Sequence, residues 1–198
     1  MRKLEKPTDL PKEVFLECIS NYRDEDLKTR LSSYTDEIIR VSEIYEDKVR
    51  NASLHTIATQ DQEDGIVKKS EMIGVYNNKF SKKGQPGRPY YDKLMAIPKF
   101  KKCPLCGQRI VSSLDHHLPK TKYPVLAVTP INLIPACSDC NKTKEASKPE
   151  SAEEETLHPY FDNIEDEIWL EAKVIHDDPI GFKFFVVKPQ NWNELKVK

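Results

Sequence analysis

The sequence predicts an α+β protein with helices in its first third, a cysteine-braced centre and a C-terminal β-hairpin. Three observations predict this order. Apolar residues recur at helical spacing in the first third, two C-x-x-C pairs flank two short extended segments in the middle, and two β-rich segments around a turn follow. Helical and extended periodicities are the main secondary-structure signals in a single sequence.

Seven apolar residues share one face of a single predicted helix from about Asp24 to Arg50: Leu27, Leu31, Tyr34, Ile38, Val41, Tyr45 and Val49. Such a stripe either packs within its own domain or docks on another chain, and we favour the intramolecular core. The preceding PKEVFLECIS predicts a short helix with Val14, Phe15 and Cys18 inward. Cys18 then acts as a small buried hydrophobic residue.

A loop rich in Gly, Pro and Lys, KKGQPGRP, follows and places a domain boundary near residues 83–88. We therefore expect a helical N-terminal region over residues 1–85 and a second domain over residues 86–198. After the loop, YYDKLMAIP predicts a short helix that leads to the first cysteine pair.

The C-terminal region is predicted to begin as a helix and to end as a hairpin. NKTKEASKPESAEEE starts with helix formers and becomes acidic near Pro149. EIWLEAKVI and FKFFVV flank the turn HDDPIG, and β-branched and aromatic residues around such a turn predict a β-hairpin. We expect this hairpin to cover the centre of the molecule.

Charge is distributed unevenly, although the formal net charge of the 198 residues is −1. Residues 79–148 carry 14 basic and 4 acidic side chains, against 12 and 16 in residues 1–78 and 5 and 12 in residues 149–198. The basic middle favours contact with nucleic acid, the alternative being a solvated lysine surface.

The chain has no 18-residue apolar run, and MRKLEKPTDLPKEV lacks the apolar stretch of a signal peptide. The sequence therefore predicts a cytoplasmic protein that does not contact a membrane.

Four of the five cysteines form the pairs Cys103/Cys106 and Cys137/Cys140. In a reducing cytoplasm this spacing favours metal over disulfide, and four thiolates make a closed tetrahedral zinc site of structural type. A redox pair or an iron cluster is the alternative.

Between the pairs lies LDHHLP, in which Asp115 precedes His116 and His117. On an extended strand Asp115 and His117 are expected on one face and His116 on the other, unless a bend near Pro119 changes this. An aspartate beside a histidine can orient the imidazole, or bind a metal while the imidazole acts as a base.

The central segment contains four features in order: CPLCG, LDHHLP, INLIPACSDC and the Asn directly after them. With these features it resembles the HNH endonucleases in which two cysteine pairs brace a ββα-metal motif. The resemblance covers residues 103–144. It implies that His116 is the general base and that Asp115 and Asn141 are ligands of a catalytic Mg²⁺ or Mn²⁺. It also implies that Asn132 braces the loop that orients the base.

Other residues near the motif are assigned more loosely. Three roles are open for His117: a structural residue, a phosphate contact or an additional metal ligand. His158 of LHPYFD is expected to pack and hydrogen-bond rather than to bind metal. The lysines that flank the motif are candidate phosphate contacts: Lys120, Lys122, Lys142 and Lys144.

The sequence thus predicts an HNH nuclease that hydrolyses phosphodiesters in DNA or, with less support, RNA. In layout the chain also resembles the nuclease subunits of Septu-type and retron-associated anti-phage systems, which implies an ATPase partner docked on the N-terminal helices. The alternative is a non-catalytic zinc-ribbon module that binds nucleic acid or protein and has no use for Asp115, His116 and Asn141 together.

Overall fold

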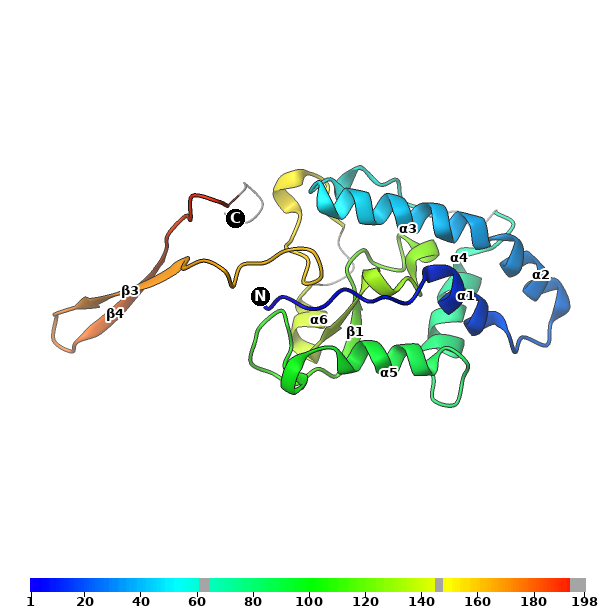
Figure 1. The fold of residues 1–198 in the computed structure, drawn as a ribbon, viewed down its shortest axis with the longest axis horizontal. Helices are drawn as coiled ribbons and strands as arrows, with labels where there is room; N and C mark the ends of the chain where they lie inside the picture. Colours follow the sequence, from blue (N-terminus) through cyan, green and yellow to red (C-terminus); the bar gives the residue numbers. More distant parts are fainter. Residues whose placement is uncertain (61–64, 145–147, 193–198) are drawn as a thin grey trace.

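The computed structural model describes residues 1–60, 65–144 and 148–192. Within these residues the fold combines six α-helices with two separate two-stranded antiparallel sheets (Figure 1). The predicted α+β class is therefore confirmed.

The N-terminal region contains helices α1 (Pro11–Ile19), α2 (Glu25–Ser33) and α3 (Thr35–Arg50). The prediction of one continuous helix from Asp24 to Arg50 is wrong, because the backbone breaks at Tyr34 (φ −87°, ψ 0°). Ser and Thr side chains compete for backbone hydrogen bonds, and here Thr35 Oγ1 donates to the Ser32 carbonyl at 2.7 Å. The stretch SSYT thus ends α2 and starts α3.

The apolar stripe lies in the core of the protein. Five of its seven members are buried, namely Leu31, Ile38, Val41, Tyr45 and Val49, and the other two, Leu27 and Tyr34, pack against the same cluster. The predicted inward residues of α1, Val14, Phe15 and Cys18, are buried in this cluster as well. The stripe is therefore intramolecular.

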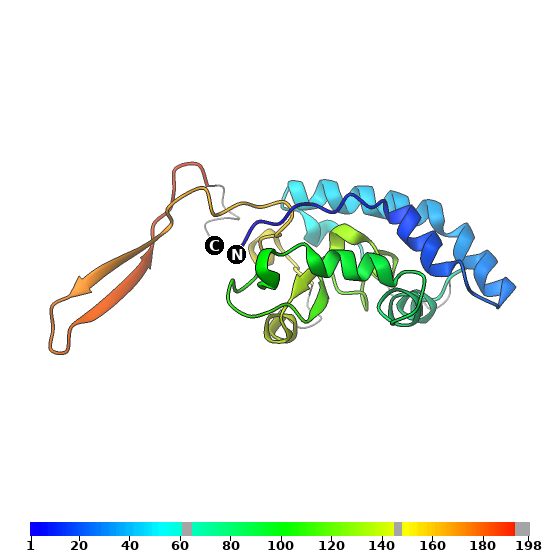
Figure 2. The ribbon, with the colours of Figure 1, turned by 60° about the horizontal axis from the view of Figure 1, so that its bottom comes forward.

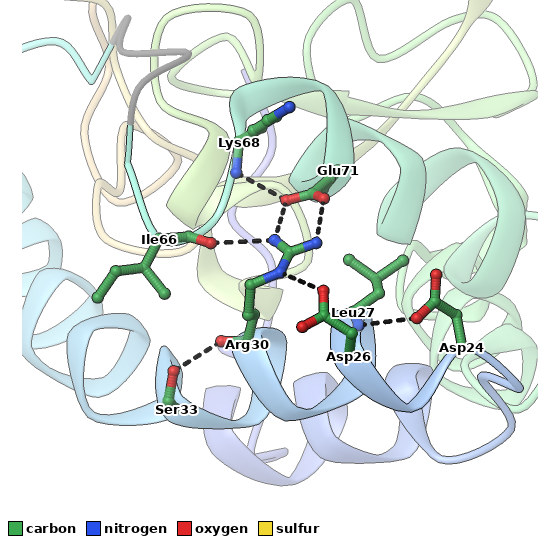
Figure 3. Close-up of polar contacts among 8 residues, drawn as sticks. All are labelled: Asp24, Asp26, Leu27, Arg30, Ser33, Ile66, Lys68 and Glu71. Atoms are coloured by element: carbon green, nitrogen blue, oxygen red, sulfur yellow. Dashed lines mark hydrogen bonds and ion pairs between the residues drawn. The ribbon is translucent and has the colours of Figure 1, made fainter.

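A further helix, α4 (Lys69–Val75), continues into the π-helical turn η2 (Tyr76–Phe80). Figure 3 shows how α4 is tied to α2: Arg30 forms two hydrogen bonds with the carboxylate of Glu71, each 2.8 Å long. Arg30 also donates to the Ile66 carbonyl at 3.0 Å and pairs with Asp26 one turn earlier.

The loop KKGQPGRP leads into α5 (Arg88–Ala96), the short helix predicted before the first cysteine pair. A Cβ at Gly87 would lie 2.4 Å from Cys18 Sγ and 2.9 Å from the Lys79 carbonyl oxygen, so only glycine allows this close approach. One hydrophobic cluster includes residues from both sides of the loop, Phe80 and Leu94 among them. The division of the chain near residue 85 stays a prediction.

The centre of the protein is a small hairpin with a helix. Strand β1 (Ser113–His116) pairs antiparallel with β2 (Leu133–Ala136), with Ser113 opposite Ala136 and His116 opposite Leu133. Helix α6 (Ser138–Lys144) follows at once and contacts β1. Five short 3₁₀ turns complete the described body: Leu54–Thr56, Lys99–Lys101, Pro124–Leu126, Pro130–Asn132 and Ala152–Glu154.

The C-terminal hairpin, β3 (Leu170–Ile175) with β4 (Gly181–Val186), forms where the sequence predicts it. The expectation that it covers the centre is wrong. Both views show the hairpin extending away from the body (Figures 1 and 2), and nearly all of its residues are exposed. The start of the predicted helix before Pro149 is α6, whereas residues 145–147 lie outside the described residues. Among the described residues, no helix combines the length and apolarity needed to cross a membrane.

Candidate active site

The four paired cysteines meet in space. One sulfur atom from each of Cys103, Cys106, Cys137 and Cys140 lies within 4.8 Å of every other. A tetrahedral zinc with bonds of about 2.3 Å holds its sulfur ligands about 3.8 Å apart, and Cys106 Sγ lies 4.0 Å from Cys137 Sγ. The donor set and the spacing therefore fit a structural metal ion such as zinc.

Local backbone geometry prepares these thiols as ligands. Gly107 (φ 69°) closes the first knuckle and donates to the Cys103 carbonyl at 2.7 Å. Hydrogen bonds from the backbone of Arg109 and Gln108 lower the pKa of Cys106 to about 6, whereas burial raises the pKa of Cys140. A metal ion favours the thiolate form throughout, so binding there releases protons.

Asp115, His116 and Asn141 line a single cavity of about 250 Å³. Asp115 and His116 come from the last two positions of β1, and Asn141 comes from α6. Because α6 begins directly after Cys137, the four-cysteine cluster fixes the helix against the strand. The four-cysteine cluster therefore helps to bring the three predicted site residues together, because it holds α6, with Asn141, beside β1, with Asp115 and His116.

The imidazole of His116 is neutral and has a defined tautomer. Its Nε2 lies 2.9 Å from the Ala127 carbonyl oxygen, which only accepts, so Nε2 carries the hydrogen. Burial, followed by the charge of Lys120, lowers the pKa of His116 to about 3. The remaining nitrogen, Nδ1, therefore carries the free lone pair of the ring, and the low pKa makes it a weak base near pH 7.

The carboxylate of Asp115 is 6% exposed and has a charged neighbour. Lys144 Nζ lies 3.2 Å from Asp115 Oδ2 and also donates to the carbonyl oxygens of His116 and His117, at 3.0 and 2.8 Å. Burial raises the pKa of Asp115, and the charge of Lys144 opposes that rise. Lys144 thus fixes the end of β1 and offsets the charge of its acid.

Two asparagines support the cavity in different ways. Asn141 Nδ2 donates to Ser113 Oγ at 2.9 Å, which assigns the amide nitrogen of Asn141 to this hydrogen bond. Asn132 is fully buried; its Oδ1 accepts from the Leu118 N–H at 2.8 Å, and its Nδ2 donates to the Leu118 and Leu126 carbonyls. Asn132 therefore closes the loop between β1 and β2, on which Ala127 also lies.

His117 does not share the face of Asp115 in the way that strand alternation predicts. Asp115 and His116 line one cavity, whereas His117 lines another with Lys144 and Glu155. The strand ends at His116, so the backbone turns before His117. The His117 ring lies 4.3 Å from that of His158, centroid to centroid.

His158 is a packing and hydrogen-bonding residue in the structure. It is 1% exposed, its Nδ1 accepts from the Tyr160 N–H at 3.2 Å, and its Nε2 faces the Ile131 carbonyl at 3.1 Å and Tyr45 Oη at 3.0 Å. Both ring nitrogens of His158 are therefore occupied by protein groups.

The four candidate lysines differ in their surroundings. Lys120 lines the cavity of His116, with its Nζ 4.2 Å from the centre of the Tyr76 ring and 3.1 Å from Asn77 Oδ1. Lys142 is exposed and Lys122 is half-buried, whereas Lys144 points into the protein.

Sequence reasoning missed Tyr76 and the role of Lys144. The Tyr76 ring lies 4.5 Å from that of His116 in an edge-on arrangement, and it lines the same cavity. Tyr76 belongs to η2, forty residues earlier in the chain, and nothing in the local pattern around it indicates a site. The spacing of Asn141 and Lys144, one helical turn apart, is a signal that could have placed both on the face of α6 toward β1.

The chain is similar to the protein Ea31 of Escherichia phage lambda. The two are 34% identical over 134 residues, which cover 66% of this chain and 45% of Ea31. The chain thus spans less than half the length of that relative. No protein-family model and no solved structure matches the chain.

Proposed function

We propose that this protein is a metal-dependent HNH endonuclease that hydrolyses phosphodiester bonds in nucleic acid. The observation that carries the proposal is the cavity shared by Asp115, His116 and Asn141 on a β-hairpin followed by a helix. The order of these residues along the chain is the order in the motif that the sequence resembles. DNA is the favoured substrate, and RNA is the second choice.

His116 is the general base in this proposal. Hydrolysis requires a group that takes a proton from water. The low pKa of His116 makes its imidazole a weak acceptor near pH 7, so the attacking water would have to be acidified by the bound cation. The Ala127 carbonyl holds the hydrogen on Nε2, which leaves Nδ1 as the accepting atom. Asn132 keeps this carbonyl in position through the loop that it closes.

Asp115 and Asn141 are the proposed ligands of Mg²⁺ or Mn²⁺. A carboxylate and an amide oxygen suit a hard divalent cation, whereas the four thiolates suit zinc. The cation would stabilise negative charge on the phosphate and on the leaving oxygen. Lys120, on the wall of the same cavity, would contact the phosphate of the substrate.

One observation favours the alternative, a zinc-ribbon module without catalytic activity. Lys144 already offsets the charge of Asp115, and a divalent cation at that carboxylate competes with the lysine. In a module of this kind Asp115 and Lys144 form a structural ion pair. The alternative predicts that divalent cations other than zinc leave the protein unchanged.

A narrower proposal concerns the cellular context. The layout of the chain supports a role as the effector of an anti-phage defence system that acts with an ATPase. The apolar stripe on α2 and α3 is buried, so such a partner would dock on the outward faces of these helices. Cleavage assays with and without an ATPase encoded beside this protein test that role.

The decisive experiment compares wild type, His116→Ala and His176→Ala on plasmid DNA, single-stranded DNA and tRNA with Mg²⁺ or Mn²⁺. His176 is an exposed histidine in the hairpin turn and serves as the matched control. We expect His116→Ala to lower the cleavage rate by about 10²- to 10⁴-fold, the usual contribution of a general base. His176→Ala should cleave as wild type does. Equal cleavage by all three proteins, or none with retained zinc, contradicts the proposal.

A further inference from the structure

Phe100 is an aromatic residue that the fold places in solvent. It is 89% exposed, more than any other large apolar side chain on the described surface. It lies in the short 3₁₀ turn Lys99–Lys101, which only Lys102 separates from Cys103, the first residue of the four-cysteine cluster. Single exposed apolar residues are common, so exposure alone assigns no role to it.

The backbone at Phe100 is strained. Phe100 has φ 55° and ψ 20°, and the next residue, Lys101, has φ 55° as well. A bulky residue in this left-handed region is an outlier, because its Cβ crowds the backbone. Strain of this kind persists where the surrounding structure imposes it, and it is concentrated at ligand-binding sites.

The surrounding structure does impose it. The Lys101 N–H donates to the Pro98 carbonyl at 3.0 Å, and the Lys101 carbonyl accepts from the Val111 N–H at 2.9 Å. Lys102 forms an antiparallel bridge with Ile110. The turn is thus fastened to the first cysteine knuckle, and the chain enters β1, with Asp115 and His116, two residues after Val111.

The neighbours of Phe100 are basic. Lys99, Lys101 and Lys102 are all exposed beside it. Phe100 also forms part of the wall of a cavity of about 900 Å³ whose lining includes the cations Arg2, Lys3, Lys6, Lys99 and Lys102. Two of these cations are paired with acids, Arg2 with Glu165 at 2.9 Å and Lys6 with Glu46, while Glu5 also lines the cavity.

An exposed ring among lysines suits nucleic acid better than protein. Lysine is depleted at protein–protein interfaces, whereas lysine ammonium groups are standard contacts of phosphates. Aromatic side chains in basic grooves bind single strands by stacking on successive bases. A base inside a duplex has both faces covered, so a single ring stacks only on an unpaired base.

We propose that Phe100, together with Lys99, Lys101 and Lys102, binds a single-stranded segment of nucleic acid. One unpaired base stacks on the Phe100 ring, and the lysines contact the adjacent phosphates. Because this strand is the substrate of the nuclease, the site rests on the function proposed above. It narrows the substrate class to nucleic acid that contains an unpaired region.

The test measures binding in the zinc-loaded full chain that carries His116→Ala, so that cleavage does not consume the probe. Fluorescence anisotropy is recorded with single-stranded DNA, single-stranded RNA and duplex DNA of one sequence. Phe100→Ala should raise the Kd for a single strand by about 5- to 150-fold, the range for loss of one stacked base. Phe184→Ala, which removes another exposed phenyl ring, is the matched control and should leave the Kd unchanged.

Two further variants separate stacking from folding. Phe100→Tyr keeps an aromatic face and should bind as the parent does. Phe100→Gly removes the ring and relieves the backbone strain, so it should bind weakly while its Tm rises by about 2–4 °C. Weak binding combined with a lower Tm would mean that the ring supports the fold, and that result overturns the proposal.

The failure of this site and the failure of the nuclease give different results. Equal Kd values for Phe100→Ala and Phe184→Ala, or equal losses on single strands and duplex, overturn the site even where His116-dependent cleavage is present. Conversely, loss of single-strand binding in Phe100→Ala without any His116-dependent cleavage supports the site and contradicts the nuclease. The DNA and RNA arms show which strand binds more tightly.

Discussion

Asn132 is the polar residue on which the loop between β1 and β2 depends. It is fully buried, and its side chain makes three hydrogen bonds with the backbone of Leu118 and Leu126. A buried amide that satisfies three backbone groups is costly to remove, because each backbone group left without a partner remains buried and has no water to replace the lost hydrogen bond.

We therefore expect Asn132→Ala to lower the free energy of unfolding by about 2–4 kcal/mol. Asn132→Asp should be destabilising too, because a carboxylate cannot donate to the two carbonyls that the amide contacts. Urea unfolding followed by circular dichroism measures both effects. Asn191→Ala, at an exposed asparagine that contacts Glu167, is the control and should change stability by less than about 0.5 kcal/mol. A loss for Asn132→Ala as small as that of the control would contradict a bracing role.

For single residues, the sequence predicts which site residues come together, but it does not predict the directions in which their side chains point. Asp115, His116 and Asn141 share a cavity, in line with the motif order. Strand alternation assigns Asp115 and His116 to opposite faces, but β1 ends at His116 and alternation no longer holds there. Tyr76 could not be found from sequence, because its contact with His116 depends on packing between distant segments.

The four-cysteine cluster joins the first knuckle to β2 and α6. Cys103 and Cys106 precede β1, while Cys137 and Cys140 flank the start of α6. Such a cluster closes a loop in a small unit with little apolar core of its own, so metal binding there contributes directly to folding.

Cys103→Ser should abolish metal binding and destabilise the central unit, since structural zinc contributes on the order of 10 kcal/mol to folding in small zinc modules. The wild type should hold one zinc per chain by elemental analysis, and its thermal transition should broaden or split after a strong chelator is added. Cys18→Ala is the control: Cys18 is buried in the helical core, away from the cluster, so this variant should keep its zinc. Full zinc content in Cys103→Ser would show that the cluster is not the metal site.

The pair Arg30–Glu71 links α2 to α4 and makes a pH-dependent contribution to stability. The hydrogen bonds from Arg30 (Figure 3) lower the pKa of Glu71 below its usual value. A carboxyl whose pKa is lower in the folded state stabilises the protein above its unfolded pKa. That contribution is lost as the pH falls through the folded value.

Glu71→Gln should lower the Tm by about 2–4 °C near pH 7, as expected for loss of one charge-assisted bidentate contact at a partly exposed site. The difference from wild type should shrink as the pH falls below about 4.5, where the wild-type carboxyl begins to be protonated. Thermal unfolding between pH 3 and pH 7 measures this, with the exposed Glu43→Gln as the control. A difference that is constant with pH would rule out the charge of Glu71 as its cause.

Element types were predictable where apolar spacing is regular, and element ends were not. The periodicity from Leu27 to Val49 is continuous across Tyr34, so it cannot reveal a break caused by side-chain hydrogen bonds of Ser and Thr. The hairpin strands β3 and β4 are predictable from composition, because turn residues separate them clearly.

The body of the molecule and the hairpin differ in how they bury apolar residues. The body has a continuous core that runs from Val14 in α1 to Leu133 in β2. In the hairpin, the cross-strand pairs on one face are all apolar, namely Leu170 with Val186, Ala172 with Phe184 and Val174 with Phe182. The sequence predicted the hairpin but not its place, since strands with one apolar face are equally consistent with covering the body and with projecting from it.

The apolar face of the hairpin should govern how the protein associates rather than how stably it folds. Phe182 and Phe184 are 65% and 66% exposed, and an uncovered two-stranded apolar face with free edges promotes self-association. We expect Phe182→Ser combined with Phe184→Ser to leave the Tm of the body within about 2 °C of wild type, because exposed substitutions change stability by less than about 0.5 kcal/mol. Light scattering over a range of protein concentrations should show less association in the double variant. Lys183→Ser, on the opposite face of the same strand, is the control and should associate as wild type does. A large fall in Tm for the double variant would mean that the apolar face packs on the body in solution, contrary to the projecting arm of Figures 1 and 2.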